Sequence, residues 1–138
     1  MELTRTYSND PATPRRVRED VAEALAPVLG PRRLADVELM ASEVATNAVL
    51  HSDGDQDVQL RIRVEDDSAR IEVTNSGPSF DPDALPQRDG PSGWGLRILS
   101  YLADDWGVEV SNPNVVWFRI DHDRSSLEPP ARTGPAPA

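Results

Sequence analysis

Glu43, Asn47 and His51 are three side chains with useful chemistry, spaced four residues apart in the segment SEVATNAVLH (42–51). At about 100° per residue, each step of four turns a side chain by only about 40°, so the three share one face of a helix. The opposite side of that helix is apolar and holds Leu39, Val44, Ala45, Ala48 and Val49. Such a polar stripe on a core helix is either a solvated face or one wall of a site.

The pair of Glu43 and Asn47 suits metal or proton chemistry. Carboxylate and amide oxygens hold Mg²⁺ together with waters, and a glutamate also acts as a base. The composition excludes several alternatives, because the chain has no Cys and all of its 14 basic residues are Arg. Thiolate chemistry, a P-loop lysine and a Schiff base are therefore ruled out. A nucleophile triad is not expected, because no Ser stands in a G-x-S-x-G elbow.

Three other stretches carry weaker signals. DGDQD (53–57) begins like a calcium loop, but Val58 and Val64 occupy the positions that require Gly and Glu, so we interpret it as a polar turn. The glycines of GPSGWG (90–95) precede a helix and would leave N–H groups free for an anion, although loop glycines do the same. TNSGPSF (74–80) is a strand that breaks into a turn.

The elements that position these residues follow from periodicity. Alternating patterns predict strands over 2–7, 58–65, 70–75, 105–110 and 115–121, and helical spacing predicts helices over 15–29, 34–51 and 95–103. Residues 76–92 are rich in Gly, Pro, Ser and Asp and are typical of a long functional loop. The order of elements predicts an α+β two-layer sandwich, with a mixed, mostly antiparallel sheet covered on one face by three helices.

Length and charge limit the function further. The 138 residues suffice for one domain, predicted over 1–122, and the segment 123–138 lacks periodicity and is expected to be a disordered tail. No apolar run approaches the ~20 residues of a membrane span, and no leader is evident, so we expect a cytoplasmic protein without membrane contact. The net charge of −10 argues against nucleic acid and is compatible with a basic protein partner.

Taken together and in this order, the stretches resemble the histidine-kinase-like ATPase (GHKL, Bergerat-fold) superfamily, over about residues 2–121. SEVATNAVLH resembles the N-box, with Glu43 and Asn47 at its E-x-x-x-N positions. NSGPS occupies the first glycine box, and GWGLRIL followed by LADDWGV resembles the second glycine box and the next strand. NVVWF lies where the last core strand begins. Within the superfamily, the chain is most similar to the small anti-sigma-factor serine kinases and single-domain bacterial relatives.

The resemblance implies a pocket for ATP with Mg²⁺. Asn47 would coordinate the Mg²⁺ that bridges the phosphates, and Glu43 would be the base that activates a hydroxyl or water. The residues implied in nucleotide binding are Asn47, Asn75, Gly77, Gly93, Gly95, Leu96, Arg97 and Val115. Among them, Gly93 and Gly95 would offer N–H groups to the phosphates, with Arg97 as a nearby charge partner. The match also implies that Trp106 and Trp117 lie in the core.

The sequence departs from the family at the base-recognition end. Asn75 stands where the family usually has an Asp that accepts from the adenine amino group, Ser79 replaces a glycine, and Val115 replaces a Thr. An Asn side chain is able to turn either its oxygen or its NH₂ group inward. We therefore expect weakened ATP binding and poor discrimination between ATP and GTP.

The implied activity is phosphoryl transfer from ATP to a Ser or Thr of an antagonist protein, in a partner-switching pathway. The implied partners are ATP and a sigma-factor-like protein or an anti-sigma antagonist, and a homodimer is compatible with the resemblance. The alternative is a pseudokinase-like module that holds a regulatory protein with weak or no nucleotide use. Asn75 and Val115 favour this alternative, whereas Glu43 and Asn47 favour the enzyme.

Overall fold

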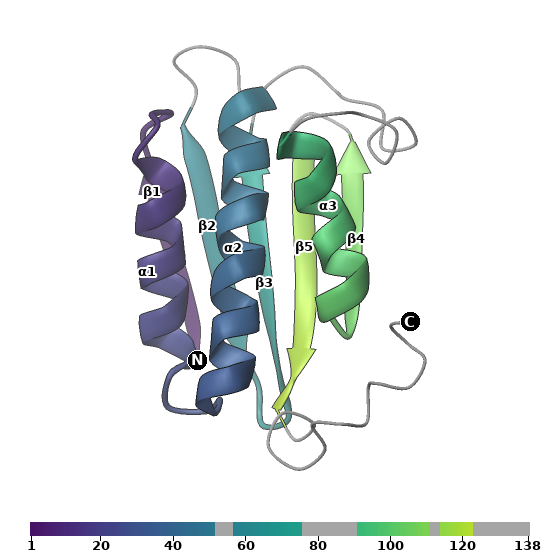
Figure 1. The fold of residues 1–138 in the computed structure, drawn as a ribbon. Coiled ribbons are helices and arrows are strands. Elements are labelled where there is room, and N and C mark those ends of the chain that lie inside the picture. The colour runs from purple at the N-terminus through teal and green to yellow at the C-terminus, as the bar shows by residue number, and fades with distance from the viewer. Residues whose placement is uncertain (52–56, 76–90, 111–113, 123–138) are drawn as a thin grey trace.

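The computed structural model describes residues 1–51, 57–75, 91–110 and 114–122, drawn in colour in Figure 1. Its elements, in chain order, are β1 (Glu2–Tyr7), α1 (Thr13–Leu25), α2 (Pro31–His51), β2 (Val58–Val64), β3 (Ser68–Asn75), α3 (Pro91–Leu102), β4 (Asp105–Val110) and β5 (Asn114–Asp121). The long loop and the tail expected from the sequence, along with Gly77 and Ser79, lie outside the described residues.

The five strands form one sheet in the order β1-β2-β3-β5-β4. Each neighbouring pair is antiparallel, so the sheet is antiparallel throughout its described strands. The three helices lie side by side on one face of it, with α2 in the middle (Figure 1). The predicted α+β two-layer sandwich with three helices on one face is therefore confirmed.

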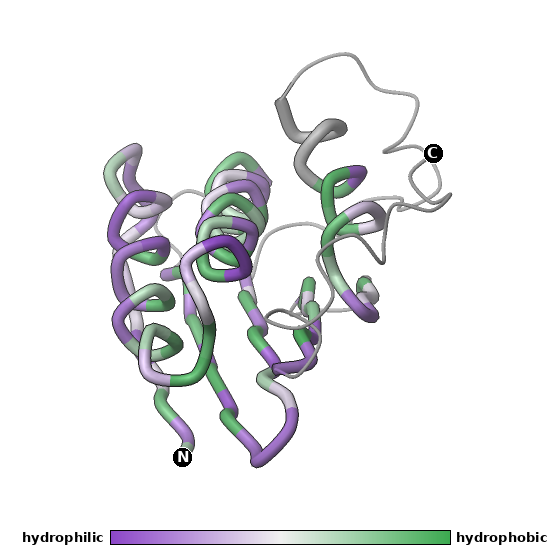
Figure 2. Tube along the Cα trace, turned by 60° about the horizontal axis from the view of Figure 1, so that its bottom comes forward, coloured by the Kyte–Doolittle hydropathy of each residue, from purple (hydrophilic) through white to green (hydrophobic). Residues whose placement is uncertain are grey.

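The core lies between the helices and the sheet. In β5, every second residue is buried, so the positions of Val116, Phe118 and Ile120 face the helices. The helices complement this face, since α1 turns its hydrophobic residues toward the sheet and its hydrophilic ones outward (Figure 2). In α2, Leu39 is 44% exposed rather than in the core, which corrects the expectation. It lies four residues before Glu43, so it is turned only about 40° from Glu43 and does not belong to the opposite side of the helix.

The helix boundaries differ from the prediction at ends where a proline starts or stops the helix. Helix α1 ends at Leu25 instead of residue 29, because Pro27 has no N–H to continue the ladder and its ring clashes with the preceding turn. Helices α2 and α3 each begin at a proline, Pro31 and Pro91, three or four residues earlier than expected. Proline is favoured at a first helical position, where the missing N–H would have had no partner.

Trp117 lies on the open face of the sheet rather than in the core, which corrects the expectation from its sequence position. It alternates with the buried Val116 and Phe118 and is half-buried. The guanidinium carbon of Arg70 lies 4.0 Å from the centre of its ring. On the neighbouring strand, Gly107 leaves room for the indole, because an added Cβ would come within 2.7 Å of Trp117 Nε1. Trp106, by contrast, packs against the core as expected.

Candidate functional site

Four element ends meet at one end of the molecule. The C-terminal end of α2, the N-terminal end of α3, the last residue of β3 and the first residue of β5 all lie at the upper end in Figure 1. Antiparallel pairing of β3 with β5 explains part of this arrangement, because it places Asn75 directly opposite Asn114. The fold thus brings the predicted residues of α2 and β3 to the same end.

Asn47 is the most unusual side chain at this end. It is only 1% exposed, and neither its Oδ1 nor its Nδ2 has a hydrogen-bond partner among the described residues. Buried amide groups are almost always satisfied, because leaving one unpaired costs on the order of 1–3 kcal/mol. An unsatisfied buried asparagine is explained if a ligand or an ordered water completes its hydrogen bonds or coordination.

Glu43 lies one helical turn before Asn47 and is half-buried. Burial raises the pKa of its carboxyl above the ordinary value, because loss of water disfavours the charged form. A carboxylate with a raised pKa binds a proton more readily, which is the property required of a general base. Between the two residues, Thr46 bonds back to its own helix through Oγ1, which donates to the Ser42 carbonyl at 2.8 Å.

Asn75 connects the sheet to the end of α2. It is 2% exposed, and its Nδ2 donates to the backbone carbonyl of His51 over 3.2 Å. His51 is the last residue of α2, where carbonyl groups no longer find a partner within the helix. The NH₂ group of Asn75 is therefore directed at the helix end, which fixes an orientation that the sequence left open.

Asn114 is a buried polar residue of this site that sequence reasoning missed. It is fully buried at the start of β5 and lies across from Asn75 on the side of the sheet that faces the helices. Val115, which was expected to line the pocket, has the opposite parity and lies on the open face with Trp117. Alternation along β5 would have revealed that Asn114 faces inward, since the apolar residues Val116, Phe118 and Ile120 share their face with position 114.

The second glycine box forms the start of α3. Gly93 lies in the first turn, where N–H groups have no acceptor within the helix, and Gly95 comes at its end. Gly93 is therefore the better placed of the two to bind an anion through its backbone. Leu96 is 3% exposed and belongs to the core, so its side chain supports the helix, and Arg97 is half-buried.

These donors fit a magnesium–nucleotide complex better than a metal alone. The described part of the chain holds no group of three or more His, Asp or Glu side chains able to ligate a metal. A site with so few protein ligands is still able to bind Mg²⁺, because this ion keeps several waters and takes its remaining ligands from substrate phosphates. The unsatisfied amide of Asn47 and the helix N-terminus at Gly93 suit the metal and the phosphates respectively.

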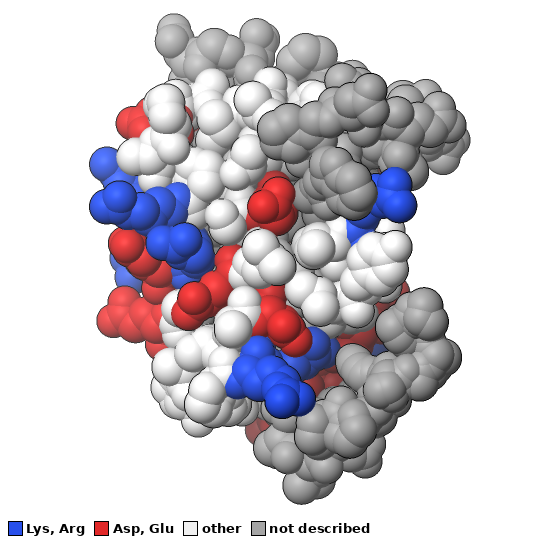
Figure 3. Space-filling view, viewed as in Figure 1, with Lys and Arg blue, Asp and Glu red and all other residues white. Residues whose placement is uncertain are grey.

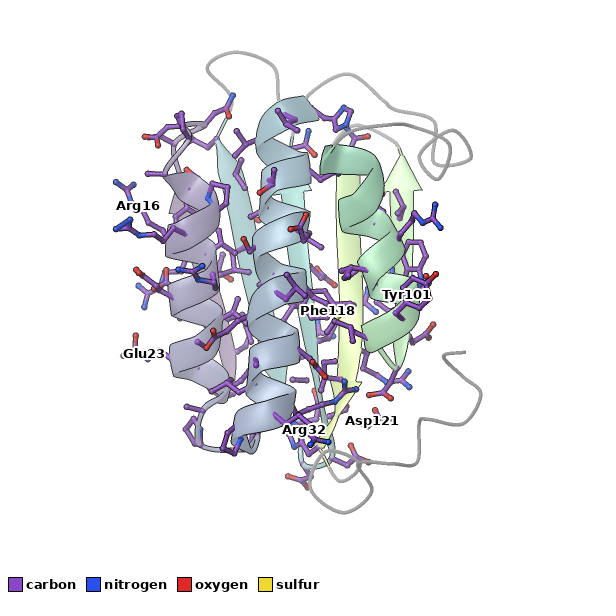
Figure 4. All side chains as sticks on the ribbon, in the orientation of Figure 1. Arg16, Glu23, Arg32, Tyr101, Phe118 and Asp121 are labelled. Atoms are coloured by element: carbon purple, nitrogen blue, oxygen red, sulfur yellow. The ribbon has the colours of Figure 1, made fainter. Side chains whose placement is uncertain are left out.

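The charges of the helix-bearing face are mixed, despite the net charge of −10. Arginines gather over the upper part of α1, and acidic residues lie below them (Figure 3). Arg15 and Arg16 belong to this region, and Arg16 points away from the molecule in Figure 4. No helix within the described residues is long and apolar enough to cross a membrane.

Comparison with known sequences gives consistent matches. The histidine kinase-like ATPase domain pattern matches residues 7–120 of this chain. The serine-protein kinase RsbW of Bacillus subtilis (strain 168) is 31% identical over a match of 114 residues, and the coverage is 65% of this chain and 70% of the relative. The RsbW kinase of Bacillus velezensis is 32% identical over 111 residues, with 64% and 69% covered.

Solved structures give the same fold at lower identity. The RsbU and RsbW domains of Rv1364c from Mycobacterium tuberculosis match with a TM-score of 0.69 and 20% identity, over 87% of this chain and 32% of that one. The catalytic domain of histidine kinase ThkA matches with a TM-score of 0.57 and 15% identity, over 87% and 96%. At these identities the likeness establishes the fold alone.

Proposed function

Because the chain belongs to the histidine kinase-like ATPase family, we propose that it binds ATP with Mg²⁺ and transfers phosphate to a Ser or Thr hydroxyl of a protein. The similarity to RsbW serine-protein kinases supports this reaction class. The single observation that carries the proposal is Asn47, whose buried amide lacks any partner within the described residues. A ligand that completes this amide gives a reason for its burial.

Each residue of the site has a proposed task. Asn47 would ligate Mg²⁺ through Oδ1, and bound Mg²⁺ would neutralise phosphate charge. The N–H groups in the first turn of α3, including that of Gly93, would hold phosphate oxygens. Glu43 would accept the proton of the attacking hydroxyl, a task that suits its raised pKa. Asn114 would line the site beside Asn75.

The biological role that fits this reaction is partner switching. The chain would act in the cytoplasm, phosphorylate an antagonist protein and also hold a sigma-factor-like protein, a role that its similarity to RsbW kinases supports. A second candidate is a binding module that uses nucleotide weakly or not at all. Asn75 favours this second candidate, because its neutral amide oxygen accepts a weaker hydrogen bond from a base than a carboxylate would.

Calorimetric titration with ATP, with and without Mg²⁺, tests the proposal. We expect ATP to bind with Mg²⁺ and to bind more weakly after Mg²⁺ is chelated. The Asn47→Ala variant should lose the Mg²⁺-dependent part of the affinity, on the order of tenfold or more. Thr46→Ala is the matched control, because Thr46 is a neighbour whose hydroxyl bonds within its own helix. Absence of ATP binding at millimolar concentration would favour the binding module.

A further inference from the structure

We propose that Asn75 is a positioning residue that caps the C-terminal end of α2, and that this task requires an amide rather than a carboxylate. Its Nδ2 donates to the His51 carbonyl, which stands at the end of a 21-residue helix. A carboxylate at position 75 has no hydrogen to donate and would place its negative charge against the carbonyl oxygen. The capping task therefore explains why Asn stands here.

The cap lies close to the residue that carries the proposed function. His51 follows Asn47 by four residues, so the two are joined by one turn of α2. Asn75 itself is held in place by β3, where its neighbours in register are Val58 on one side and Asn114 on the other. The bond thus fixes the last turn of α2, and with it Asn47, to the rigid sheet.

Capping of α2 and recognition of a base predict opposite effects of Asn75→Asp on ATP binding. If Asn75 served chiefly to accept a hydrogen bond from a base, Asn75→Asp would add charge to that bond and tighten ATP binding at neutral pH. If Asn75 caps α2, Asn75→Asp removes the donor and loosens the turn that holds Asn47. Position 75 is only 2% exposed and faces a carbonyl oxygen, so the pKa of an introduced carboxyl should lie well above the ordinary value of Asp. Mild acid then protonates this carboxyl and restores a donor, so the defect should diminish.

The test measures the thermal midpoint of wild type, Asn75→Asp and Asn75→Ala without nucleotide, at about pH 7.5 and about pH 5. Asn75→Ala lacks a donor at either pH and shows the loss of the bond alone. We expect both variants to melt lower than wild type at the higher pH, with a shift on the order of 5 °C. On acidification, Asn75→Asp should recover relative to Asn75→Ala.

Among the described residues, two titratable side chains lie close in sequence to the bonded residues or to their strand neighbour, and both are present in all three proteins. His51 contributes the acceptor carbonyl, and Asp57 precedes Val58, the neighbour of Asn75 in β2. Differences between the variants therefore report on position 75. An Asn75→Asp protein as stable as wild type at about pH 7.5, or one that gains nothing over Asn75→Ala at about pH 5, would overturn the capping task.

ATP titration of the same variants links the cap to the site, and this link rests on the proposed function. We expect Asn75→Asp to bind Mg²⁺–ATP about tenfold more weakly than wild type at neutral pH and to recover at acid pH. Tighter binding at neutral pH would instead mean that Asn75 accepts from the base. If wild type binds no nucleotide, the proposed function fails, whereas the melting experiment still decides whether Asn75 caps α2.

Discussion

Arg33 and Asp104, 71 residues apart in the chain, form a buried ion pair at the end of the molecule opposite the candidate site. Arg33 Nη2 lies 2.8 Å from Asp104 Oδ2, and the two side chains are only 6% and 3% exposed. Arg33 Nη1 also donates to the Leu102 carbonyl, at the end of α3, and Asp104 Oδ2 accepts from the backbone N–H of Asp121. Arg33 therefore joins the beginning of α2 to the end of α3 and, through Asp104, to β5.

Removal of this arginine should destabilise the fold strongly. Arg33→Met keeps an unbranched apolar stem but leaves the Asp104 carboxylate buried without its guanidinium, a change expected to cost about 3–5 kcal/mol. Arg32→Met is the matched control, because the adjacent Arg32 is exposed and lies at the surface in Figure 4, so a change within ~0.5 kcal/mol is expected. Urea unfolding of both variants measures the difference. Equal losses would mean that the pair is not critical.

The proposed chemistry separates two residues of the same helix. Glu43→Gln keeps the size of the side chain and removes the base, so phosphoryl transfer should fall by about 10²–10⁴-fold while ATP affinity stays nearly unchanged. Asn47→Ala should instead weaken the binding of Mg²⁺–ATP. Glu38→Gln, also on α2, controls for the loss of one negative charge. Transfer at the wild-type rate by Glu43→Gln would remove Glu43 from the mechanism.

Glu43 should also make the fold sensitive to pH. Because burial raises its folded-state pKa, the neutral carboxyl is favoured in the folded protein, and stability is lost as pH rises through that pKa. Glu43→Gln should therefore be more stable than wild type near neutral pH and equal to it in acid, where both side chains are neutral. Thermal midpoints across the acid range measure the trend. A gain that persists unchanged below about pH 4 would contradict it.

Gly107 should tolerate no side chain while Trp117 holds its position. An alanine Cβ would meet three indole atoms at 2.7–2.9 Å, and Arg70 stacks on the same ring system. We expect Gly107→Ala to cost about 1–3 kcal/mol, because the indole must move. Combining it with Trp117→Val removes the clash, so a double-mutant cycle should show strong coupling. Additive losses would mean that the indole adapts freely.

The sequence was sufficient for elements whose periodicity is unbroken. Strict alternation predicted β2 to within one residue, and the apolar spacing of 34–51 predicted where α2 ends. Errors arose where a local rule was overlooked. Pro27 ends α1 early, and the parity of β5 places Val115 on the outer face, although both signals are present in the sequence.

Contacts between distant segments could not be predicted in the same way. The bond from Asn75 to His51 joins residues 24 apart, and its direction depends on how the sheet and α2 meet. The pairing of β3 with β5, which skips β4, likewise has no counterpart in local periodicity. Asn47 could be placed on a helix face from its spacing, but its lack of a partner among the described residues emerges only when all of these neighbours are in place.

Helix α2 is bonded to other elements near both of its ends, at Arg33 and at His51. These two points are 18 residues apart, or about 27 Å along the axis. Such a helix cannot roll about its long axis without breaking a polar bond at one end or the other. The orientation of the helix about its axis is therefore fixed, so that Asn47 stays buried and Leu39 and Leu50 stay exposed. A protein bound to the outer side would meet the same apolar residues unless one of the two bonds is broken.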